Sequence, residues 1–326
     1  MIVDKFNRIH DYLRISITDN CNLRCFYCMP EEDYHFTPSS QLMQADEIEA
    51  IAKTFVAQGV NKIRLTGGEP LVRKDFADIL KKLAALNIQL TMTTNATRLH
   101  EFVNEIKAAG IQFLNISLDT LQKDRFILMT KRDQHEQVMR NIQLMMDNGI
   151  GVKLNVVAMK GVNEEEINDF VRWTKDTPIH VRFIEFMPFD GNKWNREKVI
   201  TLQEILDRVK TEFEFTSIER SAHETAKNYQ VIGHKGTFAV ISTMSAPFCG
   251  DCNRMRLTAD GKMKNCLFST SETDLLTAYR TGADITPLIL QNISDKKQAL
   301  GGQFTTDLEK IETGALHNRT MISIGG

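Results

Sequence analysis

The chain of 326 residues has no apolar run long enough to span a membrane, so no membrane-spanning helix is predicted. Its N-terminal residues lack the apolar core of a secretion signal, and we therefore expect the protein in the cytoplasm. An excess of charge is absent too, because the formal net charge is −2, and nucleic acid is not expected as a partner. An anionic ligand must therefore be held by a local cluster of Arg and Lys.

Cysteine is scarce as well, and its six residues fall into two groups of three. In a reducing compartment, such cysteines are better explained as metal ligands than as disulfides. The first group comprises Cys21, Cys25 and Cys28. Thiolates suit iron–sulfur clusters, zinc or copper(I), and structural zinc normally takes four protein ligands. Three thiolates would leave one iron of a 4Fe–4S cluster open to a small molecule; the alternative is three buried cysteines with no chemical role.

Strand and helix patterns alternate through about residue 185. The predicted strands span 12–18, 62–66, 89–93, 113–118, 151–157 and 181–185. The predicted helices span 45–58, 76–83, 99–109, 134–147 and 164–175. Because this alternation implies a parallel sheet with right-handed crossovers, we expect an α/β fold: an incomplete TIM-like barrel of six units, where eight would close it. We divide the chain into a partial barrel, 1–188, and a C-terminal region, 189–326.

Within these strands, apolar and polar residues alternate instead of forming continuous apolar runs. The apolar positions are Leu13, Ile15, Ile63, Leu65, Leu114, Ile116, Val152 and Leu154. The polar positions are Arg14, Ser16, Arg64, Thr66, Thr91, Thr93, Asn115, Ser117, Lys153 and Asn155. A polar inner face predicts a lumen that holds a polar ligand. The alternative is an antiparallel sheet with one face in water.

The stretch Gly67-Gly68-Glu69-Pro70 directly follows the second predicted strand. Glycine allows the backbone to approach a ligand closely. A simple turn between strand and helix would also explain the two glycines.

The second cysteine group comprises Cys249, Cys252 and Cys266, and the Asp260-Gly261 turn signal folds the last of them back towards the others. Zinc with an unidentified fourth ligand and a second 4Fe–4S cluster both fit this spacing. Arg254 and Arg256 lie two residues apart, so their side chains share one face of a strand. Guanidinium groups suit phosphates, although exposed arginines are more often simply solvated.

The first group, with Tyr27 before its last cysteine, resembles the signature of the radical S-adenosylmethionine (SAM) superfamily. The resemblance implies that the open iron chelates SAM, and that an electron splits SAM into methionine and a 5′-deoxyadenosyl radical. Gly67-Gly68-Glu69-Pro70 resembles the motif that hydrogen-bonds the methionine amino group in that superfamily.

More of the chain resembles one family of radical SAM enzymes, the GTP 3′,8-cyclases that start molybdenum cofactor biosynthesis. The stretches that carry the resemblance are Leu13–Ser16, Cys21–Pro30, Ile63–Pro70, Thr93–Asn95, Asn115–Asp119, Val152–Asn155, Arg182–Met187, Cys249–Leu257 and Gly325-Gly326. Two positions depart from the family pattern, Ala96 where the family commonly has Gly, and Ser323 before the terminal Ile-Gly-Gly.

The resemblance implies two 4Fe–4S clusters, held by Cys21, Cys25, Cys28 and by Cys249, Cys252, Cys266. The second lies in the C-terminal region, which we expect to close the open side of the barrel. The implied GTP-binding positions are Arg14, Arg64, Thr93, Lys153, Arg254, Met255 and Arg256. The implied SAM-binding positions are Tyr27, Gly68, Ser117 and Met187. The implied catalytic residues are the first cysteine trio, Arg254 and Arg256.

The implied reaction takes hydrogen from carbon 3′ of GTP and joins that carbon to carbon 8 of guanine, which gives (8S)-3′,8-cyclo-7,8-dihydroguanosine 5′-triphosphate. The implied partners are GTP, SAM, an external electron donor and a downstream cyclic pyranopterin monophosphate synthase, with the chain as monomer or homodimer. We expect the second cluster to bind guanine, through nitrogen or oxygen. The alternatives are another radical SAM enzyme with an auxiliary cluster and a non-enzymatic zinc-binding protein.

Overall fold

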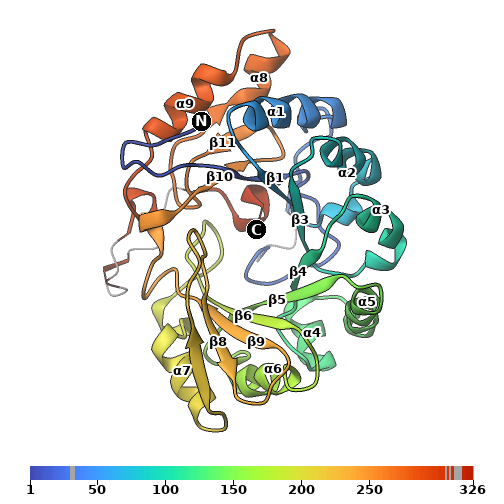
Figure 1. The fold of residues 1–326 in the computed structure, drawn as a ribbon, viewed down its shortest axis with the longest axis vertical. Helices are drawn as coiled ribbons and strands as arrows, with labels where there is room; N and C mark the ends of the chain where they lie inside the picture. Colours follow the sequence, from blue (N-terminus) through green and yellow to red (C-terminus); the bar gives the residue numbers. More distant parts are fainter. Residues whose placement is uncertain (30–33, 305–306, 308–309, 312–317, 326) are drawn as a thin grey trace.

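The computed structural model describes residues 1–29, 34–304, 307, 310–311 and 318–325. Pro30 and Gly326, which belong to the motifs above, lie outside the described residues. The strands form one sheet of twelve, in the order β12-β11-β10-β1-β2-β3-β4-β5-β6-β9-β8-β7. The sheet curves strongly, and helices cover its outer side (Figure 1).

Six central strands pair in parallel in the order of the sequence. They are β1 (Tyr12–Ser16), β2 (Lys62–Thr66), β3 (Gln89–Thr94), β4 (Phe113–Ser117), β5 (Gly151–Ala158) and β6 (His180–Glu185). The helices between them are α1 (Ala45–Ala57), α2 (Phe76–Ala84), α3 (Val103–Ala108), α4 (Lys123–Thr130), α5 (His135–Asp147) and α6 (Ile167–Trp173). The prediction of a parallel α/β sheet is confirmed, and the antiparallel alternative is wrong.

Two predicted helices are shorter than expected, and one helix was not predicted. The stretch 99–109 begins as a 3-10 turn, η2 (Leu99–Glu101), and 164–175 begins as η3 (Glu164–Glu166). The unpredicted helix is α4, in which Phe126 and Met129 are buried while Leu128 is 69% exposed. An exposed leucine within the apolar run blurs the stripe that identifies an amphipathic helix.

The alternation within the strands separates a core from a lumen. The apolar positions of β1 and β2, among them Leu13 and Ile63, are fully buried and belong to one core with Phe55 of α1 and Phe76 of α2. Because neighbouring residues of a strand point to opposite faces, the polar positions point away from the helices, to the inside of the curve.

The C-terminal region continues this sheet at both edges. At one edge β9 (Thr237–Ile241) pairs in parallel with β6, followed by the antiparallel β8 (Lys227–Val231) and β7 (Phe215–Ile218). At the other edge β10 (Arg254–Leu257) pairs in parallel with β1, followed by the antiparallel β11 (Lys262–Lys264) and β12 (Thr273–Asp274). This region therefore widens the sheet, because the free edges of β1 and β6 offer unpaired backbone groups, and among the described strands the outermost two, β12 and β7, do not pair with each other.

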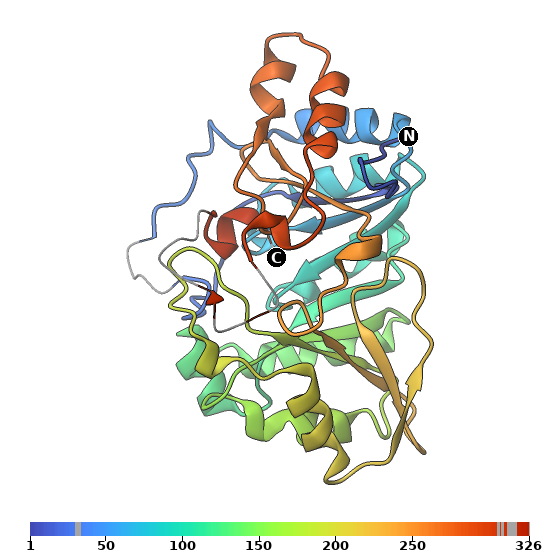
Figure 2. The same cartoon turned by 90° about the vertical axis from the view of Figure 1, so that its left-hand side faces the viewer.

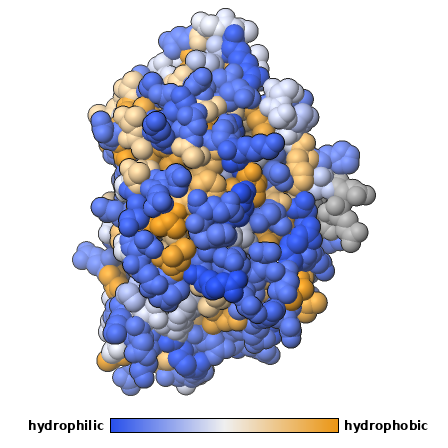
Figure 3. All heavy atoms as spheres, turned by 90° about the vertical axis from the view of Figure 1, so that its right-hand side faces the viewer, coloured by the Kyte–Doolittle hydropathy of each residue, from blue (hydrophilic) through white to orange (hydrophobic). Residues whose placement is uncertain are grey.

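Four more helices complete the described chain: α7 (Leu202–Lys210), α8 (Leu275–Arg280), α9 (Thr286–Ser294) and α10 (Met321–Ile324). Helices α8 and α9 lie at the same end of the molecule as α1 and the N-terminus (Figures 1 and 2). Within the described residues, none of the helices has the length and hydropathy needed to cross a bilayer. The outer helical face in Figure 3 is mainly hydrophilic, with apolar residues in small separate groups.

The C-terminal tail runs to the inside of the sheet (Figure 1). The carbonyl of Gly325 accepts a hydrogen bond from Arg256 Nη1 at 2.7 Å. Gly325 has φ of 81°, and a Cβ there would lie 2.7 Å from both Ser16 Cβ and Thr66 Oγ1. Only glycine fits between the ends of β1 and β2 in this conformation.

Candidate active site

The first cysteine trio lies in the loop that follows β1, and the Gly67-Gly68 turn after β2 packs directly against that loop. Gly68 N donates to Thr18 O at 2.7 Å. A Cβ on Gly67 or Gly68 would lie 2.5 Å from a backbone oxygen of Thr18 or Asn20, respectively. The glycines are therefore required for the close approach of the two loops.

Glu69 joins this turn to the end of β3. Its carboxylate is fully buried and accepts hydrogen bonds from Leu71 N at 3.0 Å, Thr94 Oγ1 at 2.8 Å and Asn95 N at 2.6 Å. Burial raises the pKa of Glu69 to about 7, although these hydrogen bonds act in the opposite direction. The carboxylate is thus used to position the loops.

Tyr27 is held by the ends of two other strands. Its hydroxyl donates to Asp119 Oδ2 at 2.6 Å, and Asp119 Oδ1 accepts from Val157 N at 2.9 Å. Burial and the nearby Asp119 raise the pKa of Tyr27 well above its usual range, so the hydroxyl keeps its proton. The aromatic ring within the trio is therefore fixed relative to β4 and β5.

The three thiols of this loop are free, and their surroundings disfavour thiolates. Burial raises the pKa of Cys21 to about 11 and that of Cys28 to about 12, and it raises the pKa of Cys25 as well. The carboxylate of Asp119 adds to the effect at Cys25 and Cys28. A metal centre supplies the positive charge that makes such thiols deprotonate, so this donor set fits an iron–sulfur cluster.

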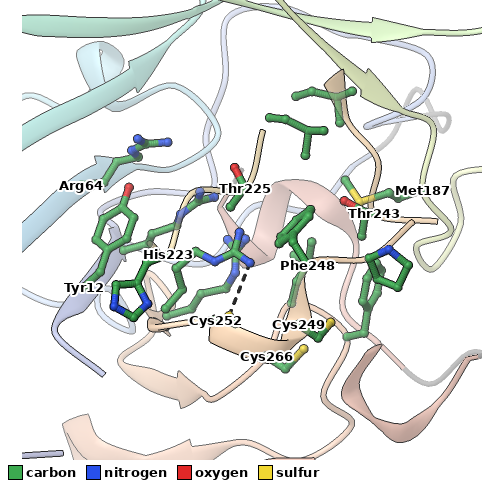
Figure 4. Close-up of a pocket in the computed structure, with 18 of the residues that line it drawn as sticks. Tyr12, Arg64, Met187, His223, Thr225, Thr243, Phe248, Cys249, Cys252 and Cys266 are labelled. Carbon is green, nitrogen blue, oxygen red and sulfur yellow. Dashed lines mark hydrogen bonds between the residues drawn. The ribbon is translucent and has the colours of Figure 1, made fainter. Parts of the chain in front are cut away.

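The second trio is assembled around β10 and β11. Cys249 begins the 3-10 turn η5 (Cys249–Asp251), Cys252 directly follows it, and Cys266 follows β11. Arg254 Nη2 donates to Cys252 Sγ at 3.4 Å, and the Arg254 guanidinium lies 4.8 Å from the centroid of the Phe248 ring. The three thiols border a common space (Figure 4).

The charge around this trio differs from that around the first. Burial acts to raise the pKa of Cys252, but the cations of Arg254 and Lys296 outweigh it and lower the pKa to about 6. Cys252 is therefore disposed to ligate a metal as a thiolate. Among the described residues, no three His, Cys, Asp or Glu side chains are arranged to chelate a single metal ion, so neither trio is a preformed single-ion site.

A basic cavity extends from the second trio along the inner face of the sheet (Figure 4). Parallel pairing of β1 with its two neighbours brings Arg14 opposite both Arg64 and Arg256. The cations that line the cavity are Arg14, Lys62, Arg64, Lys153, Arg182, Arg254 and Arg256. Glu224 is the one acidic residue among the described residues of the lining. The cavity thus has the charge expected for a polyanionic ligand.

Several buried polar atoms in this cavity have no partner in the protein. They are the Nε atoms of Arg14, Arg64 and Arg182, the hydroxyl of Tyr12 and Oδ1 of Asn155. Buried polar groups in native proteins are normally hydrogen-bonded, and exceptions often mark a ligand site. Burial and neighbouring arginines lower the pKa of Arg182 to about 9 and that of Arg256 to about 10. An anion would accept hydrogen bonds from the unpartnered Nε atoms and from the Tyr12 hydroxyl, and it would reduce the repulsion between the cations.

Tyr12 lies at the centre of these cations. Burial acts to raise the pKa of its hydroxyl, but Arg64, Arg14 and Lys62 outweigh this and lower it to about 8. The same three side chains lie 5.1 to 5.7 Å from the centroid of its ring. Tyr12 therefore presents an acidic hydroxyl to whatever the cavity binds.

The structure brings most of the predicted site residues to one cavity, but not all of them. Arg14, Arg64, Thr93, Lys153, Met187, Arg254 and Arg256 line it. Met255 does not, because its side chain is fully buried in the core opposite Leu13. The first trio, Tyr27, Gly68 and Ser117 are not among the described residues that line it either.

Sequence reasoning missed three residues that continue the period-2 pattern it used. Tyr12 and Lys62 lie two positions before Arg14 and Arg64 and share their face, and Arg182 lies opposite Asn155 in the pairing of β5 with β6. It also missed His223 and Thr225, which come from the loop between β7 and β8 (Figure 4). No signal in the sequence identifies that loop as part of the site.

The fold and the cysteine loop define the class, because residues 15–174 match the family model described as Radical SAM superfamily. Residues 179–301 match the model described as Molybdenum Cofactor Synthesis C. The chain is 47% identical to "GTP 3',8-cyclase, mitochondrial" of Arabidopsis thaliana, over 100% of this chain and 84% of the relative. It is 41% identical to "GTP 3',8-cyclase" of Rhodopirellula baltica, over 100% and 92%. The chain belongs to the GTP 3′,8-cyclase family.

Other relatives are longer, and more distant proteins share the fold. The chain is 42% identical to "Molybdenum cofactor biosynthesis protein 1" of Homo sapiens over 99% of its own length, but it spans only 51% of that protein. Streptococcus suis SuiB bound to S-adenosylmethionine aligns with a TM-score of 0.60 and 16% identity, over 97% of this chain and 77% of SuiB. Family membership does not support the two alternatives, a different radical SAM enzyme and a non-enzymatic zinc protein.

Proposed function

We propose that the protein is a GTP 3′,8-cyclase, a radical SAM enzyme that converts GTP to (8S)-3′,8-cyclo-7,8-dihydroguanosine 5′-triphosphate in the first step of molybdenum cofactor biosynthesis. One observation carries the proposal beyond family membership. The lumen of the barrel is lined by seven cations and bordered by the second cysteine trio. This arrangement suits a nucleoside triphosphate whose base faces the trio and whose phosphates face the cations.

The phosphates of GTP would bind the cations on β1, β2, β5 and β10. Arg14, Arg64, Lys153, Arg254 and Arg256 supply the positive charge, and the unpartnered Nε atoms of Arg14 and Arg64 are available as donors. Guanidinium groups bind phosphate oxygens through paired hydrogen bonds. Tyr12 and Arg182 join this set. Thr93 and the backbone of Met255 complete the proposed GTP-binding positions.

Cys21, Cys25 and Cys28 would hold one 4Fe–4S cluster, and Cys249, Cys252 and Cys266 a second. With SAM bound, the first cluster supplies the electron that splits SAM and so produces the radical that abstracts hydrogen. Tyr27, Gly68, Ser117 and Met187 are the proposed SAM-binding positions. Each belongs to a segment at the carboxyl end of a central strand, which is where barrel enzymes assemble their sites.

The protein's own contribution is to orient GTP and to exclude water. Fixing the triphosphate among the cations places the ribose at a defined position. Hydrogen abstraction from carbon 3′ is then accelerated because the reacting atoms are held close together. Carbon 3′ then bonds to carbon 8 of guanine, and one electron and one proton complete the product. One hydrogen leaves and one is gained, so the product is an isomer of GTP.

We further propose that an external donor supplies the electrons, that a cyclic pyranopterin monophosphate synthase takes the product, and that the protein acts in the cytoplasm as a monomer or homodimer. The reaction consumes electrons, so it requires a donor. The reactive cyclised nucleotide also requires a following enzyme.

Anaerobic incubation of the reconstituted protein with SAM, dithionite and GTP deuterated at carbon 3′ tests the proposal. Because the product has the mass of its precursor apart from the label, nucleotides are separated by chromatography before mass analysis. We expect a new isomer of GTP and 5′-deoxyadenosine that carries one deuterium. Formation of unlabelled 5′-deoxyadenosine without a new nucleotide would reject the proposal.

The second trio, with three thiolates, leaves one iron of a 4Fe–4S cluster for the guanine. Electron–nuclear double resonance of the reduced protein with nitrogen-15-labelled GTP tests this. A nitrogen coupling supports ligation through nitrogen. A second sample carries an oxygen-17 label at the guanine carbonyl, and a coupling from this label supports ligation through oxygen. If neither label gives a coupling at full GTP occupancy, purine ligation is contradicted.

A further inference from the structure

Lys296 is a buried lysine beside the second cysteine trio, just after α9. It is 2% exposed, and its ammonium takes part in no carboxylate ion pair within the described residues. Its Nζ donates to Arg254 O at 3.1 Å and to Cys252 Sγ at 3.7 Å. A buried charge without a counter-charge is costly, so the position implies an anionic group at Cys252.

The N-terminal segment before β1 holds this lysine in place. His10 Nδ1 lies 3.5 Å from Lys296 Nζ, and His10 Nε2 lies 3.1 Å from Asp4 Oδ2. Burial lowers the pKa of His10 to about 4, so the ring is neutral. A neutral ring that donates from Nε2 to Asp4 has an acceptor at Nδ1, which matches the ammonium of Lys296.

The same segment also forms a hydrogen bond to the backbone of the second cysteine trio. Arg8 Nη1 donates to Cys249 O at 2.7 Å and to Gln298 O at 2.9 Å, and Arg8 Nε donates to Asp4 Oδ2 at 2.6 Å. Asp4, Arg8 and His10 are each less than 10% exposed. The first ten residues thus connect the cysteine loop to the segment that carries Lys296.

We propose that Lys296 is a positioning residue for the second cluster. Its ammonium donates a hydrogen bond to the thiolate of Cys252 and so makes the cluster easier to reduce. The N-terminal segment holds the Lys296 side chain in this position. The inference rests on the second cluster proposed above. Reduction adds an electron to the cluster, so a fixed positive charge and an N–H···S hydrogen bond favour the reduced state. Among the described residues, no cation donates a hydrogen bond to a sulfur atom of the first trio: Cys21 Sγ accepts from Leu23 N and Asn95 Nδ2, and Arg24 donates to the carbonyl oxygen of Cys21 instead.

The test is an electron paramagnetic resonance redox titration of the full-length protein with both clusters reconstituted. Lys296→Met removes the charge and keeps the length of the side chain. At a fixed ambient potential we expect the ratio of reduced to oxidised second cluster to fall at least tenfold, which is 59 mV for a one-electron couple. The first cluster is the internal reference and should not shift.

Two variants sharpen the test. Lys297→Met changes the exposed neighbour and should leave both potentials unchanged. Lys296→Arg keeps the charge and should shift the second potential by less than Lys296→Met. If Lys296→Met prevents the second cluster from assembling, a Lys296→Arg protein that retains the second cluster supports the proposal. Loss of the second cluster in both variants, together with a lower melting temperature, overturns the proposal.

Equal potentials in the wild type and in Lys296→Met, with both clusters present, would overturn the inference and leave the proposed function intact. A wild-type protein that binds iron for only one cluster would instead reject the second cluster, and this inference with it. Proton double resonance gives an independent check, since the exchangeable coupling from Lys296 should be absent in Lys296→Met.

Discussion

The two cysteine trios have the same number of thiols, but charged groups of opposite sign lie beside Cys25 and beside Cys252. At the first, burial and the carboxylate of Asp119 raise the pKa of Cys25 well above its usual range. At the second, Arg254 and Lys296 overcome the effect of burial and lower the pKa of Cys252 to about 6. The first is built from one short loop, whereas the second joins a hairpin to the N-terminal segment.

If both trios hold clusters, as proposed above, this difference would give the two clusters different redox properties. Negative surroundings disfavour an added electron, which suits a cluster that must donate one to SAM. Positive surroundings favour the electron and attract an anionic substrate, and the second trio borders the basic cavity. The neighbours of a metal centre, and not only its ligands, set its chemistry.

The largest expected effect comes from breaking the first trio. Cys25→Ala removes one of three thiolates, so SAM cleavage should be abolished while the second cluster is retained. The measurement is the yield of 5′-deoxyadenosine from anaerobically reconstituted protein, with iron and sulfide analysis as the control for the second cluster. A normal yield would refute the assignment of this trio.

Breaking the second trio should give the complementary result. Cys266→Ala should retain the first cluster and some uncoupled SAM cleavage, but no cyclised nucleotide should form, because the substrate loses its ligand. Both products are quantified in the same reaction. Cyclisation at the wild-type rate would show that the second trio is not required for cyclisation.

A smaller effect is expected at the phosphate end of the cavity. Lys153→Ala should weaken GTP binding by about 1.5–3 kcal/mol, the range for a hydrogen bond to a charged group. Calorimetry measures the affinity, and Lys160→Ala, at a surface lysine just after β5 that pairs with Glu204, is the matched control. Equal affinities for the two variants would make Lys153 a packing residue.

The smallest expected effect concerns Tyr12. Tyr12→Phe removes a buried hydroxyl that has no partner in the protein, so the melting temperature should not fall. GTP affinity should fall by about 0.5–1.5 kcal/mol, the range for a single hydrogen bond. An unchanged affinity would mean that the hydroxyl does not contact the nucleotide.

Local patterns made the barrel and its lining predictable. Period-2 alternation in β1, β2 and β5 identified Arg14, Arg64 and Lys153 as residues on the inner face, because a strand fixes the direction of its side chains. The same rule, applied one step further along β1, would have found Tyr12, and applied to β6 it would have found Arg182, which pairs with Asn155 of β5.

Long-range pairing was not predictable from the sequence. The attachment of β9, and through it β8, to β6 depends on which sheet edge is free in the folded chain, and local patterns do not reveal this. Likewise, Asp4, His10 and Lys296 look like ordinary surface residues in the sequence. Only the fold brings these residues together, since His10 and Lys296 are 286 positions apart in the sequence.

The pairing of β1 with β10 has a consequence for biosynthesis on the ribosome. Tyr12 pairs with Lys62 on one side and with Arg254 on the other, so one edge of β1 stays open until the nascent chain is nearly complete. Cys266 emerges 171 residues after Asn95, which contacts Cys21 Sγ of the first trio, and this distance corresponds to on the order of 10–30 s of translation. During that interval the growing chain would expose an unpaired strand edge, which is a site for aggregation until the second cysteine trio is assembled.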